Sequence, residues 1–203
     1  MNTNENSRGN GNGNATGAQA YRPSLRFYHA NAKGTGCAMR LELHPAHDRV
    51  DGSIFACLAN QMTVGDRQGP NPTFPRFDWE NAITVKLDFS DLSMILQVLR
   101  GECEDLQDGR GLFHRSTQAN TRIALRHLVE APGGYSLDVF RTALRGGDER
   151  RAHILISTSE ATGLAEAIAG SMAVISFGIP MVIAHDTSAY EAEMKELRNA
   201  PAA

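Results

Sequence analysis

Apolar and polar residues alternate along much of the first half of the chain, which is typical of strands that bury one face. This alternation predicts strands at residues 25–29, 37–43, 53–61 and 83–89. The apolar spacing then changes to three and four residues, which predicts a helix with apolar positions at Leu92, Ile95, Leu96 and Leu99. Ser90 is a suitable N-cap, and Gly101 ends this helix. The expected order of the first half is therefore ββββα.

The second half repeats this order, with strands expected at residues 111–115, 122–129, 135–142 and 151–157. Ser157 or Thr158 can cap a long helix after the last strand. Gly178 and Pro180 stop it, and its apolar stripe consists of Leu164, Ile168, Met172 and Ile175. Two ββββα repeats predict an α+β fold with two antiparallel four-stranded sheets and a helix after each, and residues 62–76 form the longest loop.

The second expected helix carries many small residues beside its apolar stripe. They are Ala161, Ala165, Ala167, Ala169, Gly170, Ser171 and Ala173. Small side chains allow packed elements to approach closely. Two interpretations remain open: this helix packs against the sheets of its own domain, or it forms a subunit interface built from helices.

Composition limits the class of protein. The chain has 203 residues and is 41% hydrophobic, so most of it can fold around a core, and a wholly disordered protein is excluded. The Asn/Gly-rich residues 1–23 are expected to be a disordered tail, residues 24–181 the folded domain, and residues 182–203 a mildly acidic helix or tail. With three widely spaced cysteines, and with neither a signal-peptide pattern nor a long apolar run, we expect a cytoplasmic protein with reduced thiols and no membrane partner.

Charge is distributed unevenly along the chain. The net charge is -3, yet residues 110–151 hold eight arginines against four acidic residues. Sequence-tolerant binding of single-stranded nucleic acid needs cations for phosphates and flat side chains for bases. Candidates on polar strand faces, in turns or in loops are Tyr28, Lys33, Arg40, Phe55, Phe77, Lys86, Arg122 and Arg126. Trp79, the single tryptophan, is interpreted as an anchor for the loop before the fourth strand.

Simpler roles are open for these candidates. Arginines on an outer sheet face can serve solubility alone, and Tyr28 and Phe55 can be buried. Lys33, in a glycine-flanked turn, can approach a phosphate or contact another subunit.

Several segments in order resemble the Whirly family of single-stranded DNA-binding proteins of plants. The most specific are Lys33-Gly34 before a strand containing Ala38 and the segment Phe77-Asp78-Trp79-Glu80, inside a doubled ββββα frame. The resemblance extends over about residues 25–181 and implies a homotetramer with a helical centre and sheets facing outward, which bind single strands. Because the N-terminus lacks the character of a transit peptide, the chain resembles a bacterial-type relative, with association with the nucleoid left open.

Signals for an enzyme are weak. The segment His44-Pro45-Ala46-His47-Asp48 offers metal-binding side chains, but it reads more simply as a turn at the end of a strand. Gly34-Thr35-Gly36 lacks the lysine and hydroxyl residue of a phosphate-binding loop. We therefore expect neither an enzyme nor a cofactor or metal. The first hypothesis is a binder of single-stranded DNA, with RNA open, in DNA repair, DNA maintenance or transcription regulation; the second is a structural oligomer or protein-interaction scaffold.

Overall fold

A computed structural model describes residues 24–46, 50–66, 68, 70–130, 133–144, 146–147 and 149–178. The expected tails at residues 1–23 and 182–203, the helix stop at Pro180, and His47 with Asp48 lie outside these residues. None of the helices in the described ranges is long and apolar enough to cross a membrane.

The first half of the chain forms an antiparallel sheet. Its strands are β1 (Ser24–His29), β2 (Cys37–His44), β3 (Ser53–Thr63), β4 (Arg76–Phe77) and β5 (Ile83–Leu87). The strands β1, β2 and β3 are neighbours in that order, and the far edge of β3 is shared by β5, at residues 54–58, and β4, at residues 61–63. The expectation of four strands therefore needs one correction, because the end of the loop at residues 62–76 and Phe77 form the short extra strand β4.

Helix α1 (Phe89–Leu99) follows this sheet and begins two residues earlier than expected from a Ser90 cap. The N-cap is Asp88, whose side chain accepts a hydrogen bond from the Asp91 N–H over 3.0 Å. The Asp91 carboxylate in turn accepts from the Asp88 N–H over 3.1 Å, which completes a capping box. The strand expected to reach Phe89 therefore ends at Leu87, and Ser90 lies inside the first turn.

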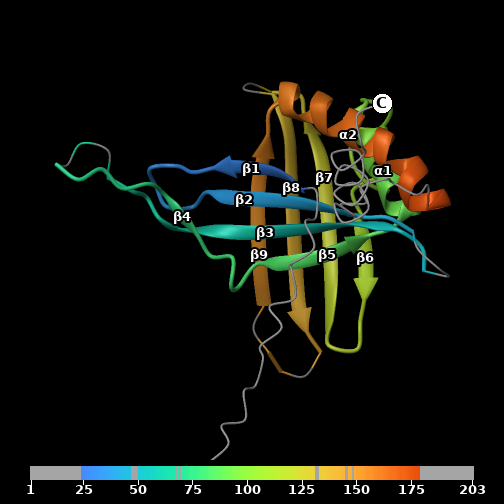
Figure 1. Ribbon diagram of the computed structural model, residues 1–203, viewed down its shortest axis with the longest axis horizontal. Coiled ribbons are helices and arrows are strands. Elements are labelled where there is room, and N and C mark those ends of the chain that lie inside the picture. Colours follow the sequence, from blue (N-terminus) through green and yellow to red (C-terminus); the bar gives the residue numbers. More distant parts are fainter. Residues whose placement is uncertain are drawn as a thin grey trace, which may run out of the picture.

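The second half forms a sheet of four antiparallel strands in sequence order. They are β6 (Leu112–Arg115), β7 (Ala119–Leu128), β8 (Gly134–Ala143) and β9 (Glu149–Ile156), followed by α2 (Thr158–Phe177). Figure 1 shows that the strands of the two sheets run across each other and that both helices lie at one end of the second sheet. The two ββββα repeats and the α+β class are thus confirmed.

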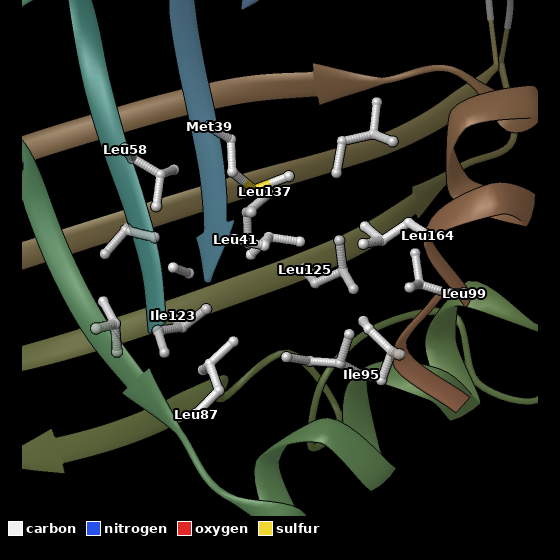
Figure 2. Close-up of a pocket in the computed structure, with 15 residues that line it drawn as sticks. Met39, Leu41, Leu58, Leu87, Ile95, Leu99, Ile123, Leu125, Leu137 and Leu164 are labelled. Atoms are coloured by element: carbon white, nitrogen blue, oxygen red, sulfur yellow. The ribbon is translucent and has the colours of Figure 1, made fainter. Parts of the chain in front are cut away.

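The core lies between the inner faces of the two sheets and the helices, as Figure 2 shows. Met39, Leu58 and Val85 line it from the first sheet, and Ile123 and Val139 line it from the second. A cavity of about 40 Å³ remains there, and its lining is apolar throughout. Because this volume is far below the ~150 Å³ of an apolar cavity that binds benzene, we regard it as a packing defect and not as a ligand site.

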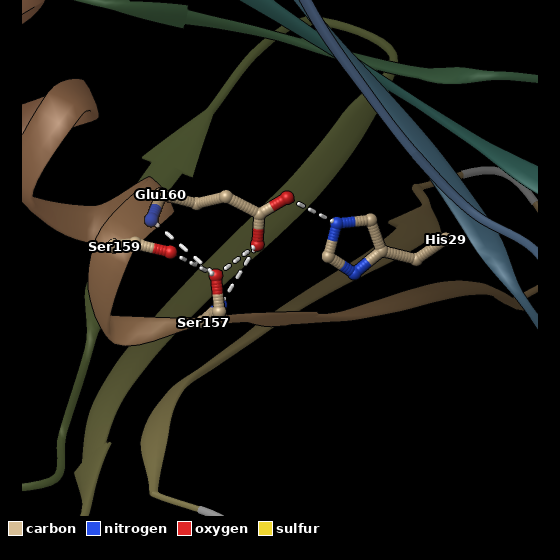
Figure 3. Close-up of polar contacts among 4 residues, drawn as sticks. All are labelled: His29, Ser157, Ser159 and Glu160. Carbon is tan, nitrogen blue, oxygen red and sulfur yellow. Dashed lines mark hydrogen bonds and ion pairs between the residues drawn. The ribbon is translucent and has the colours of Figure 1, made fainter.

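The N-terminus of α2 is held by polar contacts, drawn in Figure 3. Ser157 is the N-cap, and the Glu160 carboxylate accepts from the Ser157 N–H over 2.9 Å. His29 of β1 donates from Nε2 to the other Glu160 oxygen over 2.8 Å. Partial burial acts to raise the pKa of Glu160, but the hydrogen bonds from Ser157 and His29 outweigh it and hold this pKa below its ordinary value. An ionised Glu160 therefore joins the first strand to the last helix.

The C-terminus of α2 is held by the connection between β2 and β3. The backbone N–H groups of Gly52 and Ala46 donate to the carbonyls of Ile175 and Val174, over 3.0 and 3.4 Å. Gly52 is required here, because a Cβ at this position would lie 2.6 Å from the Ile175 Cα. Carbonyls of the last helical turn are thus bonded by a distant part of the chain, and the Val174 carbonyl also accepts from the Gly178 N–H over 3.2 Å.

Candidate nucleic-acid interface

The outer face of the first sheet, turned away from the core, gathers most of the predicted binding residues. Strand register places Tyr28 opposite Ala38, Arg40 opposite Cys57, and Phe55 between Glu42 and Lys86. All of these positions alternate with core residues, so their side chains share this outer face. The expected outward orientation of Arg40, Phe55 and Lys86 therefore agrees with the observed register.

Three aromatic residues form a cluster on this face, which we call the aromatic cluster: Tyr28, Phe77 and Trp79. The ring centroid of Tyr28 lies 5.7 Å from that of Phe77 and 6.4 Å from that of Trp79. Tyr28 is 54% exposed, so the stacking surface is open to solvent. Ala38 and Ala59, both completely buried, occupy neighbouring positions of the same face, where their small side chains leave room for the rings.

Trp79 was interpreted as an anchor for the loop before the fourth strand, but its ring lies beside Tyr28 and Arg40, so we add it to the candidate binding residues. The guanidinium carbon of Arg40 lies 5.2 Å from the centre of the indole ring, within the range of a cation–π contact. Trp79 lies in a turn between β4 and β5, so no strand alternation could have assigned it to a face. Its sequence neighbour Phe77 is the only local signal that pointed to this place.

The cations on this face differ in how strongly they are engaged. Arg40 forms an ion pair with Glu42, with 2.8 Å between Nε and Oε1. Lys86 is exposed, as is Arg26, which lies opposite Arg40 in the register. Sequence reasoning missed Arg26, although it lies two residues before Tyr28 on the same strand and therefore shares its face. The outer face thus offers two exposed cations, Arg26 and Lys86. Its third cation, Arg40, already contacts Glu42 and the Trp79 ring.

Lys33 projects from the turn between β1 and β2. The Asn31 side chain shapes this turn by accepting from the N–H groups of Lys33 and Thr35, each over 3.0 Å. Gln61 accepts from the Asn31 N–H over 2.9 Å and lies opposite Phe77 in the register. These contacts place Lys33 at the end of the sheet that carries the aromatic cluster, where it is exposed.

Arg122 and Arg126 lie elsewhere, on the outer face of the second sheet. They share this face with Ala124, and the residues between them, Ile123 and Leu125, are buried in the core. The Arg122 guanidinium donates to the backbone carbonyls of Arg110 and Gly109, each over 2.9 Å. Arg126 is exposed. Because the two sheets pack through their inner faces, the eight predicted residues belong to two separate surfaces.

Other chemistry is not assembled in the described residues. Within them, no group of three or more His, Cys, Asp or Glu side chains is placed to hold a metal. His44 lies with its ring centroid 4.4 Å from that of Phe55. The three cysteines are free of disulfides, and burial raises the pKa of the Cys37 thiol to about 11, so that it stays protonated at neutral pH.

Comparison with known proteins gives structural matches only. No family model matches the chain, and no curated protein matches it. The fold resembles that of WHY1 from Arabidopsis thaliana, with a TM-score of 0.60, 13% identity, and coverage of 87% of this chain and 93% of that one. It also resembles the plant transcriptional regulator PBF-2, with a TM-score of 0.58, 13% identity and coverage of 87% and 88%. For WHY3 from Arabidopsis thaliana the TM-score is 0.55, with 15% identity and coverage of 87% and 98%. These matches confirm that the chain has a Whirly-like fold.

Proposed function

We propose that this protein binds single-stranded nucleic acid with little sequence specificity, DNA in the first place and RNA as the other candidate. The observation that carries this proposal is the aromatic cluster, with Tyr28 exposed and Phe77 and Trp79 half-buried, and with cations on the same sheet face. Every base has a flat face, so stacking on Tyr28, Phe77 or Trp79 does not depend on base identity. Such stacking contributes about 1 to 3 kcal/mol per base.

The cations of the same face supply the second half of the interaction. Lys86, Arg26 and Lys33 are exposed and free to approach phosphates of a strand that lies across the rings. Their attraction is independent of sequence and weakens with salt, because each contact releases counterions. Binding of this kind needs no reaction step, so we propose a non-enzymatic role in DNA maintenance or transcription, which the similarity in fold to a plant transcriptional regulator supports.

We further propose that the chain assembles as a homotetramer through α2. The helix exposes small residues along one side, namely Gly163, Ala167, Gly170 and Ala173, and it ends at Phe177, which is 82% exposed. Exposed small and apolar residues allow helices of neighbouring subunits to pack closely. This arrangement leaves the outer sheet faces accessible to nucleic acid.

The proposed binding is tested with labelled oligothymidine by fluorescence anisotropy at two salt concentrations. Replacing Tyr28→Ala and Lys86→Ala together is expected to weaken binding about tenfold or more, because a stacking surface is lost. The salt slope is expected to become shallower by about 0.7 as one phosphate contact is lost. Arg100→Ala is the matched control, since it removes one positive charge from an exposed side chain at the C-cap of α1, outside this sheet.

Thermal unfolding of each variant shows that the fold is retained, and duplex DNA is the competitor. Binding that duplex DNA displaces as readily as unlabelled oligothymidine would contradict a single-strand function. No binding of oligothymidine or of an RNA oligomer at low salt would contradict the proposal and favour the structural oligomer or protein-interaction scaffold.

A further inference from the structure

The outer face of the second sheet carries a row of side chains that the proposed function has not used. The register pairs Phe113 of β6 with Arg122 of β7, Arg122 with Phe140 of β8, and Phe140 with Arg151 of β9. Each of these residues has a buried core residue next to it on its strand, so the four side chains share the outer face. These core residues are Leu112, Ile123, Val139 and Ala152. We call them the cross-strand row.

The cross-strand row alternates rings and cations over about 14 Å, three strand spacings. Phe113 is 64% exposed, although it lies on a regular strand with a buried face available on the other side. Arg122 and Arg151 are also exposed. The exposed ring of Phe113, beside Arg122, has no packing role in the core, and the ring of Phe140, between Arg122 and Arg151, is half-buried. Aromatic side chains on a four-stranded sheet are a common platform for unpaired bases.

Contacts within the fold hold this row in place. The two hydrogen bonds from Arg122 to the carbonyls of Arg110 and Gly109 fix its plane between the two phenylalanines, and leave further N–H donors for a ligand. The guanidinium carbon of Arg151 lies 4.9 Å from the centre of the Phe140 ring. The two arginines therefore have little side-chain freedom left to lose when a ligand binds.

One acid competes with a ligand for these cations. Asp138 Oδ1 accepts from Arg151 over 2.8 Å and lies 3.2 Å from Nδ1 of His153. Its other oxygen accepts from Ser136 over 3.0 Å. Partial burial acts to raise the pKa of Asp138, but the hydrogen bonds from Arg151 and Ser136 outweigh it and hold this pKa below its ordinary value. The carboxylate is therefore charged at neutral pH and occupies the position that a phosphate would take on Arg151.

We propose that the outer face of the second sheet is a separate binding surface for single-stranded nucleic acid, with bases stacking on Phe113 and Phe140, and that Asp138 limits its affinity by holding Arg151. The inference rests on the proposed nucleic-acid function but not on the aromatic cluster of the first sheet. Because the two outer faces lie on opposite sides of the core, one subunit then has two places for single strands.

The test measures oligothymidine binding by anisotropy in two backgrounds, the full-length chain and the full-length Tyr28→Ala, Lys86→Ala variant. In the second background, residual salt-sensitive binding is expected, and Phe113→Ala with Arg151→Ala is expected to weaken it about fivefold or more through lost stacking. Asp138→Asn is expected to tighten binding in both backgrounds and to steepen the salt slope by about 0.7, one additional phosphate contact. Asp51→Asn is the matched control, because it removes the same charge at an exposed side chain in the β2–β3 connection, outside the second sheet.

Thermal unfolding establishes that each variant keeps its fold. Truncation of Phe113 or Arg151 can disturb the sheet, whereas Asp138→Asn leaves the shape of the side chain nearly unchanged and so tests the inference without that risk. Two variants are compared with their parent in each background: Phe113→Ala with Arg151→Ala, and Asp138→Asn alone. If neither variant changes the affinity in either background, the inference is overturned while the first-sheet site stands. Tightening by Asp51→Asn as large as that by Asp138→Asn would also overturn it, because net charge alone would then explain the gain. Absence of oligothymidine binding by the unmodified protein would overturn both proposals.

Discussion

His114 of β6 shows how one side chain connects the two halves of the chain. Its Nε2 lies 3.0 Å from the carboxylate of Asp91, the residue that completes the capping box of α1. The hydrogen bond to Asp91 raises the pKa of His114 above its ordinary value, and partial burial opposes this only in part. A protonated His114 therefore stabilises both the second sheet and the start of α1.

The stability contributed by this contact depends on pH. Because the pKa of His114 is higher in the folded than in the unfolded chain, its contribution is complete below the unfolded pKa of about 6.5 and is lost as pH rises through the folded pKa. His114→Gln keeps a hydrogen-bond donor without the charge. We expect it to lower the free energy of unfolding by up to about 1 kcal/mol near pH 5.5 and by less near pH 8.5. Urea unfolding at both pH values measures this, and a difference that does not change with pH would contradict it.

At the scale of residues, the sequence predicted which strand positions face outward but not how they are engaged. Alternation was sufficient for Arg40, Phe55 and Lys86, because they lie on regular strands. It could not place Trp79, which lies in a turn, nor show that Arg122 is hydrogen-bonded to a neighbouring loop. Such contacts depend on backbone atoms that are distant in sequence, and no local pattern records them.

Among the helices, α1 is the clearest case in which the structure corrects the sequence pattern. Both Asp88 and Ser90 are good N-cap residues, so intrinsic preference does not choose between them. The choice follows from Asp91, which lies three residues after Asp88 and can complete the reciprocal hydrogen bonds, whereas Ser90 has Ser93 at the corresponding position. The pairing of β5 with β3 through Leu87 then fixes where the strand ends.

This choice of cap predicts different effects of two similar substitutions. Asp88→Ala is expected to lower the free energy of unfolding by about 1 kcal/mol, because the Asp91 N–H loses its acceptor. Ser90→Ala, two residues away, is expected to change it by less than about 0.5 kcal/mol. Chemical unfolding of the two variants side by side measures the difference. Equal losses of unfolding free energy in the two variants would contradict Asp88 as the N-cap.

Elements with strong periodicity were predicted within a few residues, including α2 with its Ser157 cap and its Gly178 end. Strand β4 was not predicted, because its two residues, Arg76 and Phe77, are too few to show alternation. It also pairs only with the irregular end of β3. Its position decides where Phe77 meets Tyr28, so a part of the candidate site depended on an element that the pattern could not indicate.

For the whole molecule, both helices lie at one end, and the outer faces of the sheets carry the candidate binding residues. Such a division allows assembly and binding to use different surfaces. Gly170 is a suitable position for separating them, because a Cβ placed there meets nothing within 4 Å in a single subunit.

Gly170→Glu is therefore expected to leave the fold intact but to prevent assembly, since a charged side chain would enter the helical interface. Light scattering after size-exclusion chromatography should show about four times the chain mass of 22.0 kDa for the unmodified protein, and the mass of a smaller species for the variant. Gln118→Glu, in the exposed turn between β6 and β7, is the control that adds the same charge away from the helices. An unchanged mass for a folded Gly170→Glu protein would contradict assembly through α2.

The backbone bonds between the C-terminus of α2 and residues Ala46 and Gly52 also bear on the order of events during synthesis. The β2–β3 connection leaves the ribosome long before α2 does. Until α2 emerges, the N–H groups of Ala46 and Gly52 lack these carbonyl acceptors and are left to water. The apolar face of the first sheet likewise stays exposed to water until the second sheet has been synthesised and can cover it. Although each half has the same ββββα order, we therefore expect neither half to be stable alone, and the nascent chain to fold only after α2 has emerged.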